Sequence, residues 1–242
     1  MTTAPGIVVQ EQDEKGVRRL GLGAGLGFAG ALAAIVFPLA ILFLVARFPG
    51  GFFVLSSTLV EVTSVLVLAG AILLLLSLFL YRLSFSALRK VDSRFYVASI
   101  LCILGSLGFL LLIVTAAIVV GNASSLLNCA HGQPSHALSC LESGEPFGAV
   151  TALIGFLLSW IGGVGIMVGL FLVGSRFHAG SLAASGAAYG VLLIILIVPF
   201  VGLLVPIPNL SYLLLLAPLF AVIAPGLALF GSIRTFRRIA PG

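Results

Sequence analysis

The sequence predicts an all-α fold, a polytopic transmembrane bundle of six helices with both ends of the chain in the cytoplasm. Hydrophobic residues make up 61% of the 242 residues and charged residues only 8%, against roughly 25% charged in an ordinary soluble domain. Such a chain has too little polar surface to cover a water-facing globule. Six apolar stretches are long enough to cross about 30 Å of hydrocarbon as helices, and the cations lie in short tracts between them.

A helix needs about 20 apolar residues to cross the hydrocarbon, because each residue rises about 1.5 Å and every backbone group must be hydrogen-bonded internally. Within a transmembrane domain at 20–233, the predicted spans are 20–46, 54–81, 96–121, 147–174, 182–205 and 211–233. The polar segment 1–19 predicts a flexible cytoplasmic tail, and 234–242 predicts a second cytoplasmic tail. The predicted connections are short except an extracellular loop at 122–146 and a cytoplasmic loop at 82–95.

The orientation follows from the cations, since Lys and Arg that flank a helix resist translocation. With the amino terminus inside, only Arg47 falls on the outer side. The cytoplasmic tracts then hold Lys15, Arg18, Arg19, Arg82, Arg89, Lys90, Arg94, Arg176, Arg234, Arg237 and Arg238. We therefore expect a cell-membrane protein whose partners are membrane lipids. No basic surface is large enough to follow a phosphate backbone, so we do not expect nucleic acid as a partner.

The predicted cytoplasmic loop at 82–95 carries Phe85, Leu88 and Val91 at helical spacing. This spacing fits a segment that lies along the inner lipid surface with Arg89 and Lys90 toward the headgroups. A solvated turn fits the same residues equally well.

Glycines spaced by four recur in the predicted spans, which places small residues one above another on a helix face. The pairs are Gly21 with Gly25, Gly23 with Gly27, Gly165 with Gly169, and Gly186 with Gly190. In lipid such grooves let helix backbones approach closely. We expect packing inside the bundle, with a homo-oligomer or a larger membrane complex as the alternative. No strand precedes these glycines, so they do not predict a nucleotide-binding loop.

Glu61 is the one charged residue inside a predicted span, about two turns from the outer end of the second helix. An ionised carboxylate there costs about 3 kcal/mol unless it is paired, protonated or hydrated. Glu61 is thus the best candidate for a functional intramembrane carboxylate that binds a proton or a cation. The alternatives are snorkelling to the outer interface and pairing with Arg47. We favour the alternatives, because no second ionisable group lies within a span to form a relay.

Cys129 and Cys140 flank about a dozen residues of the predicted outer loop, where the oxidising side would favour a disulfide worth about 3 kcal/mol. Two free thiols are one alternative. A metal site with His131 and His136 is another, although this spacing fits no standard zinc motif. Cys102 lies in the middle of a span and predicts a small apolar packing residue. We predict no cofactor, no metal and no catalytic residue.

Pro38, Pro199, Pro218 and Pro225 lie within predicted spans. Each proline removes a backbone donor and tends to kink its helix. In a transporter, the last two helices would be discontinuous around a site at the midplane of the membrane.

Two short segments carry a family resemblance. One is 88–95 (LRKVDSRF) leading into Gly105, and the other runs from 162–165 (GGVG) through Gly169 to 174–177 (GSRF). These segments resemble an uncharacterised family of archaeal multi-pass membrane proteins, a domain of unknown function. The resemblance covers most of the chain from about residue 82 onward. It implies an archaeal cell membrane, and it implies no known activity and no catalytic residue.

The spans are almost purely apolar and rich in small residues, so the sequence favours a non-enzymatic structural, accessory or assembly component of the membrane. The alternative is a small-solute or lipid permease that uses Glu61 and the proline-kinked helices. An enzyme is not expected, since hydrolytic or redox chemistry needs converging His, Asp, Glu or Cys at membrane depth, whereas His178 is predicted to be cytoplasmic.

Overall fold

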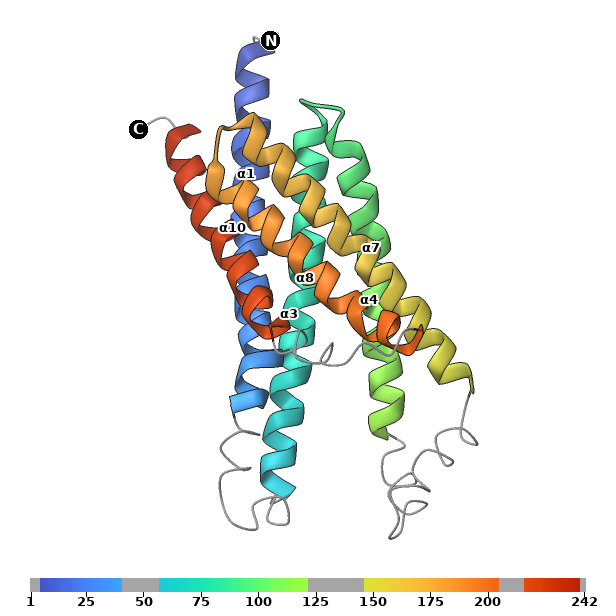
Figure 1. The fold of residues 1–242 in the computed structure, drawn as a ribbon. Helices are drawn as coiled ribbons and strands as arrows, with labels where there is room; N and C mark the ends of the chain where they lie inside the picture. Colours follow the sequence, from blue (N-terminus) through green and yellow to red (C-terminus); the bar gives the residue numbers. More distant parts are fainter. Residues whose placement is uncertain (1–4, 41–56, 122–145, 205–215, 240–242) are drawn as a thin grey trace.

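The structure, a computed structural model of residues 1–242, describes residues 5–40, 57–121, 146–204 and 216–239. The described part consists of helices and contains no strand (Figure 1). Its principal helices are α1 (Pro5–Ala31), α3 (Ser57–Arg89), α4 (Phe95–Gly121), α7 (Pro146–Arg176), α8 (Gly180–Leu204) and α10 (Ala217–Ile239). Six of the described helices are long and apolar enough to span a membrane. The predicted all-α class and the predicted number of membrane-spanning helices, six, are therefore confirmed.

The first helix begins much earlier than its predicted span. Helix α1 starts at Pro5, at a position where the missing N–H of proline costs nothing. Asp13 and Val17 are already buried against other helices. The prediction of a flexible tail at 1–19 is therefore wrong from Pro5 onward, because tertiary contacts hold this polar stretch as a helix.

Helix α3 also extends past its predicted span and ends at Arg89. Phe85 and Leu88 are fully buried in the core, so they do not lie along the lipid surface. Only Lys90 to Arg94 remain as a connecting turn between α3 and α4. Neither prediction for the loop at 82–95 describes this arrangement.

The six helices form a closed ring in which each helix contacts the next in the chain and α10 returns to contact α1. Neighbouring helices run in opposite directions, so both described ends of the chain lie at the same end of the bundle (Figure 1). A hydrogen bond from Gln10 Nε2 to the Ile239 carbonyl, 3.3 Å long, joins these two ends. We call this the terminal end of the bundle.

Helices α1 and α3 pack along a seam with a period of seven residues on both helices. The seam pairs Gly16 with Ser84, Gly23 with Ser77, and Gly30 with Gly70. The Ser84 and Ser77 hydroxyls each donate a 2.7 Å hydrogen bond to the facing glycine carbonyl. Glycine is required on α1 because a side chain there would meet the α3 backbone or side chains within about 3 Å. A seven-residue repeat keeps such a seam on one face of each helix.

Helices α4 and α7 approach most closely where Gly105 faces Gly162. A Cβ added to either glycine would overlap the Cα of the other. Gly165 continues the same seam, since a Cβ there would lie 2.6 Å from Leu101 Cβ. In Figure 1 the α4–α7 pair and the α1–α3 pair diverge away from the terminal end.

The core lies near the terminal end, where the helices converge. Its centre is an aromatic stack in which the Phe85 ring lies 6.1 Å from Tyr81 and 6.3 Å from Phe95. Gly169 on α7 provides the space for the Phe85 ring, because a Cβ there would overlap it. Burial of aromatic rings contributes stability beyond their area through offset packing.

Two of the four prolines lie well inside continuous helices. Pro225 lies inside the continuous helix α10 and is buried beside Gly27, and Pro199 lies inside the continuous helix α8. A transporter would have discontinuous helices around a midplane site, and in the described residues neither α8 nor α10 is interrupted at these two prolines. At Pro38 the outcome is different: a π-helical turn (Leu32–Val36) precedes it, which adjusts the backbone to the missing donor.

Candidate functional site at the terminal end

The charged residues gather at the terminal end of the bundle. Eleven of the chain's twelve lysines and arginines belong to the part of each helix nearer this end, on α1, α3, α7 and α10, or to the turn between α3 and α4. They are Lys15, Arg18, Arg19, Arg82, Arg89, Lys90, Arg94, Arg176, Arg234, Arg237 and Arg238. Basic residues in the last turns of α3, α7 and α10 also interact favourably with the helix dipoles.

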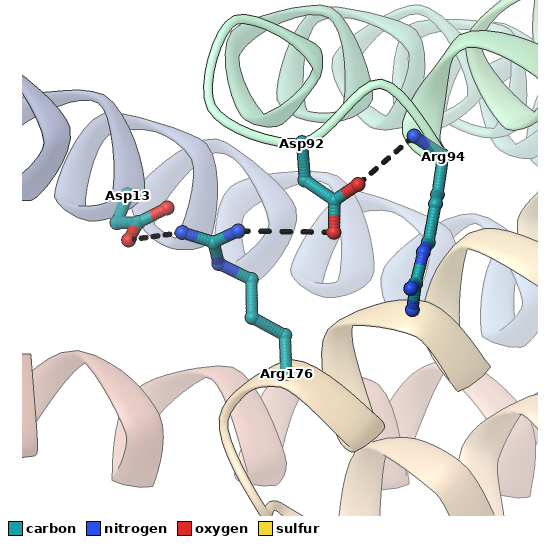
Figure 2. A network of polar contacts seen from close by, with 4 residues as sticks. All are labelled: Asp13, Asp92, Arg94 and Arg176. Carbon is teal, nitrogen blue, oxygen red and sulfur yellow. Dashed lines mark hydrogen bonds and ion pairs between the residues drawn. The ribbon is translucent and has the colours of Figure 1, made fainter.

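Arg176 lies between two carboxylates and is the centre of an ion-pair network (Figure 2). Its Nη2 atom lies 2.9 Å from Asp13 Oδ2, and its Nη1 atom lies 3.8 Å from Asp92 Oδ2. Asp92 Oδ1 accepts a 3.0 Å hydrogen bond from the Arg94 backbone N–H. The network therefore joins α1, the α3–α4 turn and the end of α7.

Local backbone geometry places the two ends of this network. After α3, the N–H groups of Val91 and Asp92 both donate to the Leu88 carbonyl, at 3.0 and 2.9 Å, and this tight turn directs Asp92 inward. After α7, His178 adopts a left-handed conformation with φ of 51°, a common way to end a helix. The Ala179 N–H then donates to the Gly174 carbonyl at 2.9 Å, which fixes the last turn that carries Arg176.

The network is largely shielded from water. The side chain of Asp13 is 12% exposed and that of Arg176 is 24% exposed. Asp13 Oδ1 is buried without a hydrogen-bond partner in the described part of the chain. A carboxylate in this setting depends on the arginine, because an unpaired buried charge is expensive. The arrangement is suited to clamping three elements together, and it contains no nucleophile and base in contact.

Below the network, the bundle interior holds Tyr81, Tyr189 and Cys102, which lie close enough to interact electrostatically. The Tyr81 hydroxyl is buried and makes no hydrogen bond of standard geometry within the described part. Cys102 is fully buried on α4, in agreement with its predicted packing role. These groups place a few polar atoms in an otherwise apolar core.

The residues predicted from the sequence have different outcomes. Glu61 lies in the first turns of α3, and the surroundings of its side chain are outside the described residues. Cys129, Cys140, His131 and His136 are also outside the described residues. Among the residues that the structure does describe, no group of three or more His, Cys, Asp or Glu is placed to hold a metal ion.

The eight glycines predicted to pack helices all face neighbouring helices of the same chain. On α1, Gly21 and Gly25 face α10, whereas Gly23 faces α3 and Gly27 faces both helices. On α7, Gly165 faces α4 and Gly169 faces Phe85 of α3. On α8, Gly186 and Gly190 lie against Met167.

Sequence reasoning missed the Asp13–Arg176–Asp92 network. In the sequence, Asp13 falls in the predicted tail, Asp92 in the predicted cytoplasmic loop, and Arg176 among the basic residues that predict the orientation in the membrane. Only the fold brings the three together. One signal was present: segments 88–95 and 174–177, which carry the family resemblance, contain Asp92 and Arg176. The structure shows that these two segments are neighbours.

The fold is that of a multi-pass membrane protein, because the six described helices have the length and apolar character of membrane spans. The chain matches no protein-family model, no curated protein and no solved structure.

Proposed function

We propose that this protein is a non-enzymatic structural component of its membrane, acting as an accessory or assembly subunit. The observation that carries the proposal is the use of buried hydroxyls as connections between helices. Ser77 and Ser84 on α3 donate to carbonyls of α1, and Ser185 on α8 donates to the Ala224 carbonyl of α10 at 2.6 Å.

The glycine seams support the same proposal. Along α1–α3 and α4–α7, small residues bring backbones into direct contact, so each of these helix pairs is closely packed. The ion-pair network ties the pairs together at the terminal end. A closely packed bundle with apolar outer faces is suited to hold partner helices in lipid.

The proposed location is the cell membrane, with the terminal end in the cytoplasm. The support for this orientation is the concentration of arginine and lysine at that end, since basic flanks are retained on the cytoplasmic side. A reporter fused to either chain end should be protected from protease added to intact cells. Digestion of one reporter but not the other would contradict the even number of crossings.

The alternative, a small-solute or lipid permease, rests on Glu61 within α3. Its second support is the proline-kinked helices, and α8 and α10 continue without a break through Pro199 and Pro225. Under this alternative, replacing Glu61 with glutamine abolishes flux while leaving the fold intact.

The test is extraction in a mild detergent, identification of co-purifying chains, and flux measurement on the purified protein in vesicles. The structural proposal expects stoichiometric partner chains and no solute or lipid flux above that of empty vesicles. A monomeric protein without partners whose flux is lost in Glu61→Gln would refute the proposal and establish the permease.

A further inference from the structure

The ion pair between Asp13 and Arg176 joins helices on opposite sides of the ring. The ring order is α1, α3, α4, α7, α8 and α10, so α1 lies opposite α7 and α3 lies opposite α8. The hydrogen bond from the Ser84 hydroxyl to the Gly16 carbonyl, by contrast, joins the neighbours α3 and α1. Because α1 and α7 are not among the helix pairs that pack extensively, the 2.9 Å contact between Asp13 and Arg176 spans the ring.

A second set of polar groups lies deeper in the ring. Cys102 of α4 lies beside Gly165 of α7, because a Cβ added to Gly165 would lie 3.1 Å from the Cys102 backbone nitrogen. Gly165 precedes Arg176 by eleven residues, so Cys102 lies about 16 Å below the network along the helix axis. Tyr81 of α3 and Tyr189 of the opposite helix α8 are close enough to Cys102 to interact electrostatically. We call Tyr81, Tyr189 and Cys102 the central polar layer.

Apolar side chains fill the space between the network and the central polar layer. Leu170 and Gly169 lie on α7 between the level of Cys102 and that of Arg176. A Cβ added to Gly169 would overlap the Phe85 ring, so Phe85 lies at the same depth. The side chains of Phe85 and Leu170 are fully buried. Water that approaches from the terminal end therefore meets the ion pairs first and an apolar layer second.

The closed state of the network depends on Arg176, because two carboxylates share its single guanidinium. Asp13 Oδ1 is inaccessible to water and has no hydrogen-bond partner in the described part of the chain. Without Arg176, Asp13 would be an unpaired buried charge, which is strongly unfavourable unless water reaches it. Hydration of Asp13 requires the ends of α1 and α7 to separate, since Asp13 Oδ1 is covered in the closed ring.

We propose that the Asp13–Arg176–Asp92 network is a latch that keeps the terminal end of the ring closed over the central polar layer. When Arg176 no longer pairs with the carboxylates, the ends of α1 and α7 separate and water enters from the terminal side as far as Cys102. The side chains of Arg176 and Asp92 are 24% and 27% exposed, so solutes at the terminal end can reach the latch. The inference holds for a structural subunit and for a permease alike, so it does not depend on the proposed function.

The test uses Cys102 as a reporter in the full-length protein, reconstituted in sealed vesicles. A small membrane-impermeant thiol reagent is added on the side of the terminal end, and mass spectrometry measures modification of the peptide that contains Cys102. In the folded wild-type protein Cys102 should stay unmodified. Arg176→Gln should raise the rate of modification at least about tenfold, a factor that corresponds to about 1.4 kcal/mol and is less than the cost of leaving a buried charge unpaired.

The carboxylate of Asp13 distinguishes a latch from general loosening. The double variant Arg176→Gln, Asp13→Asn has no unpaired buried charge on α1, so its Cys102 should be modified several-fold more slowly than that of Arg176→Gln. Arg176→Lys keeps a cation beside Asp13 and should keep most of the protection of Cys102.

The matched control is Arg89→Gln, which removes one exposed cation from the same end of the bundle and should leave Cys102 protected. A second control is Gly162→Ala, which loosens the α4–α7 seam without altering the network. The proposal is overturned if Arg176→Gln is modified no faster than the wild type, or if modification in Arg176→Gln and Gly162→Ala depends only on their free energies of unfolding. It is also overturned if the double variant is modified as fast as Arg176→Gln, or if reagent added on the opposite side reaches Cys102 of Arg176→Gln equally fast.

Discussion

Replacing Gly162 with alanine tests whether direct backbone contact holds α4 against α7. An alanine Cβ at this position would overlap Gly105 Cα and lie 3.1 Å from Gly105 N. Both obstacles are backbone atoms that no rotamer change can move. Since ordinary carbon contacts lie at about 3.5–4.0 Å, the two helices would have to separate by about 1 Å.

The expected cost follows from two opposing effects. Overfilling a packed interface costs about 1–3 kcal/mol, and alanine recovers about 0.4–1 kcal/mol by restricting the unfolded backbone. We therefore expect Gly162→Ala to lower the free energy of unfolding by about 1–2 kcal/mol.

The matched control is Gly25→Ala on α1, where the added Cβ would lie 3.8 Å from Leu229 Cδ1, an ordinary contact. This variant should be neutral or more stable by up to about 1 kcal/mol. The assay is titration with a denaturing detergent, followed by circular dichroism and by fluorescence of the single tryptophan, Trp160. Trp160 is a useful reporter because its Nε1 donates a 3.0 Å hydrogen bond from α7 to the Leu193 carbonyl of α8. The reasoning is refuted if Gly162→Ala is as stable as the wild type or if Gly25→Ala is equally damaging.

Three further outcomes are expected. Arg176→Gln should lower the free energy of unfolding by about 2–3 kcal/mol, and adding Asp13→Asn should recover part of this loss, because the unpaired carboxylate is removed. If the losses of the two single variants simply add in the same unfolding assay, the ion pair is contradicted. Ser84→Ala should lower the free energy of unfolding by about 0.6–1 kcal/mol, because the hydrogen bond between α1 and α3 is lost. Ser106→Ala should have a much smaller effect, since the Ser106 hydroxyl donates only within α4. Equal losses in the two variants would argue against a special role for the α1–α3 seam. Cys102 is fully buried, so it should react with a maleimide only after the protein unfolds. Mass spectrometry of the peptide that contains Cys102 measures the labelling, and rapid labelling of the folded protein would contradict this packing.

The spans could be predicted because crossing lipid imposes a length and a composition that a sequence displays directly. Their extensions at the terminal end could not, since Asp13 and Arg18 look like tail residues until their helical neighbours are known. Phe85 shows the same limitation: its spacing fitted a lipid-facing turn, but its ring enters the space left by Gly169. The sequence contained both residues, and only the fold pairs them.

The Asp13–Arg176–Asp92 network was unpredictable for a related reason. Its members lie on three elements separated by long stretches of chain. From the sequence alone, each member has a simpler interpretation as part of a tail, a turn or a basic flank. Glycine spacing predicted close packing but not the partner helices. The partners depend on the ring order, which hydropathy does not encode.

The contact between α1 and α10 has a consequence for how the protein is made. Helix α1 is synthesised before α10, so the surface formed by Gly21 and Gly25 receives its partners, Ser232 and Leu229, only when α10 has been made. During translation this small-residue surface is therefore open to lipid or to an insertion chaperone. Completion of the ring is a late event, and a ribosome stalled before α10 would leave both α1 and α8 without one of their two neighbouring helices.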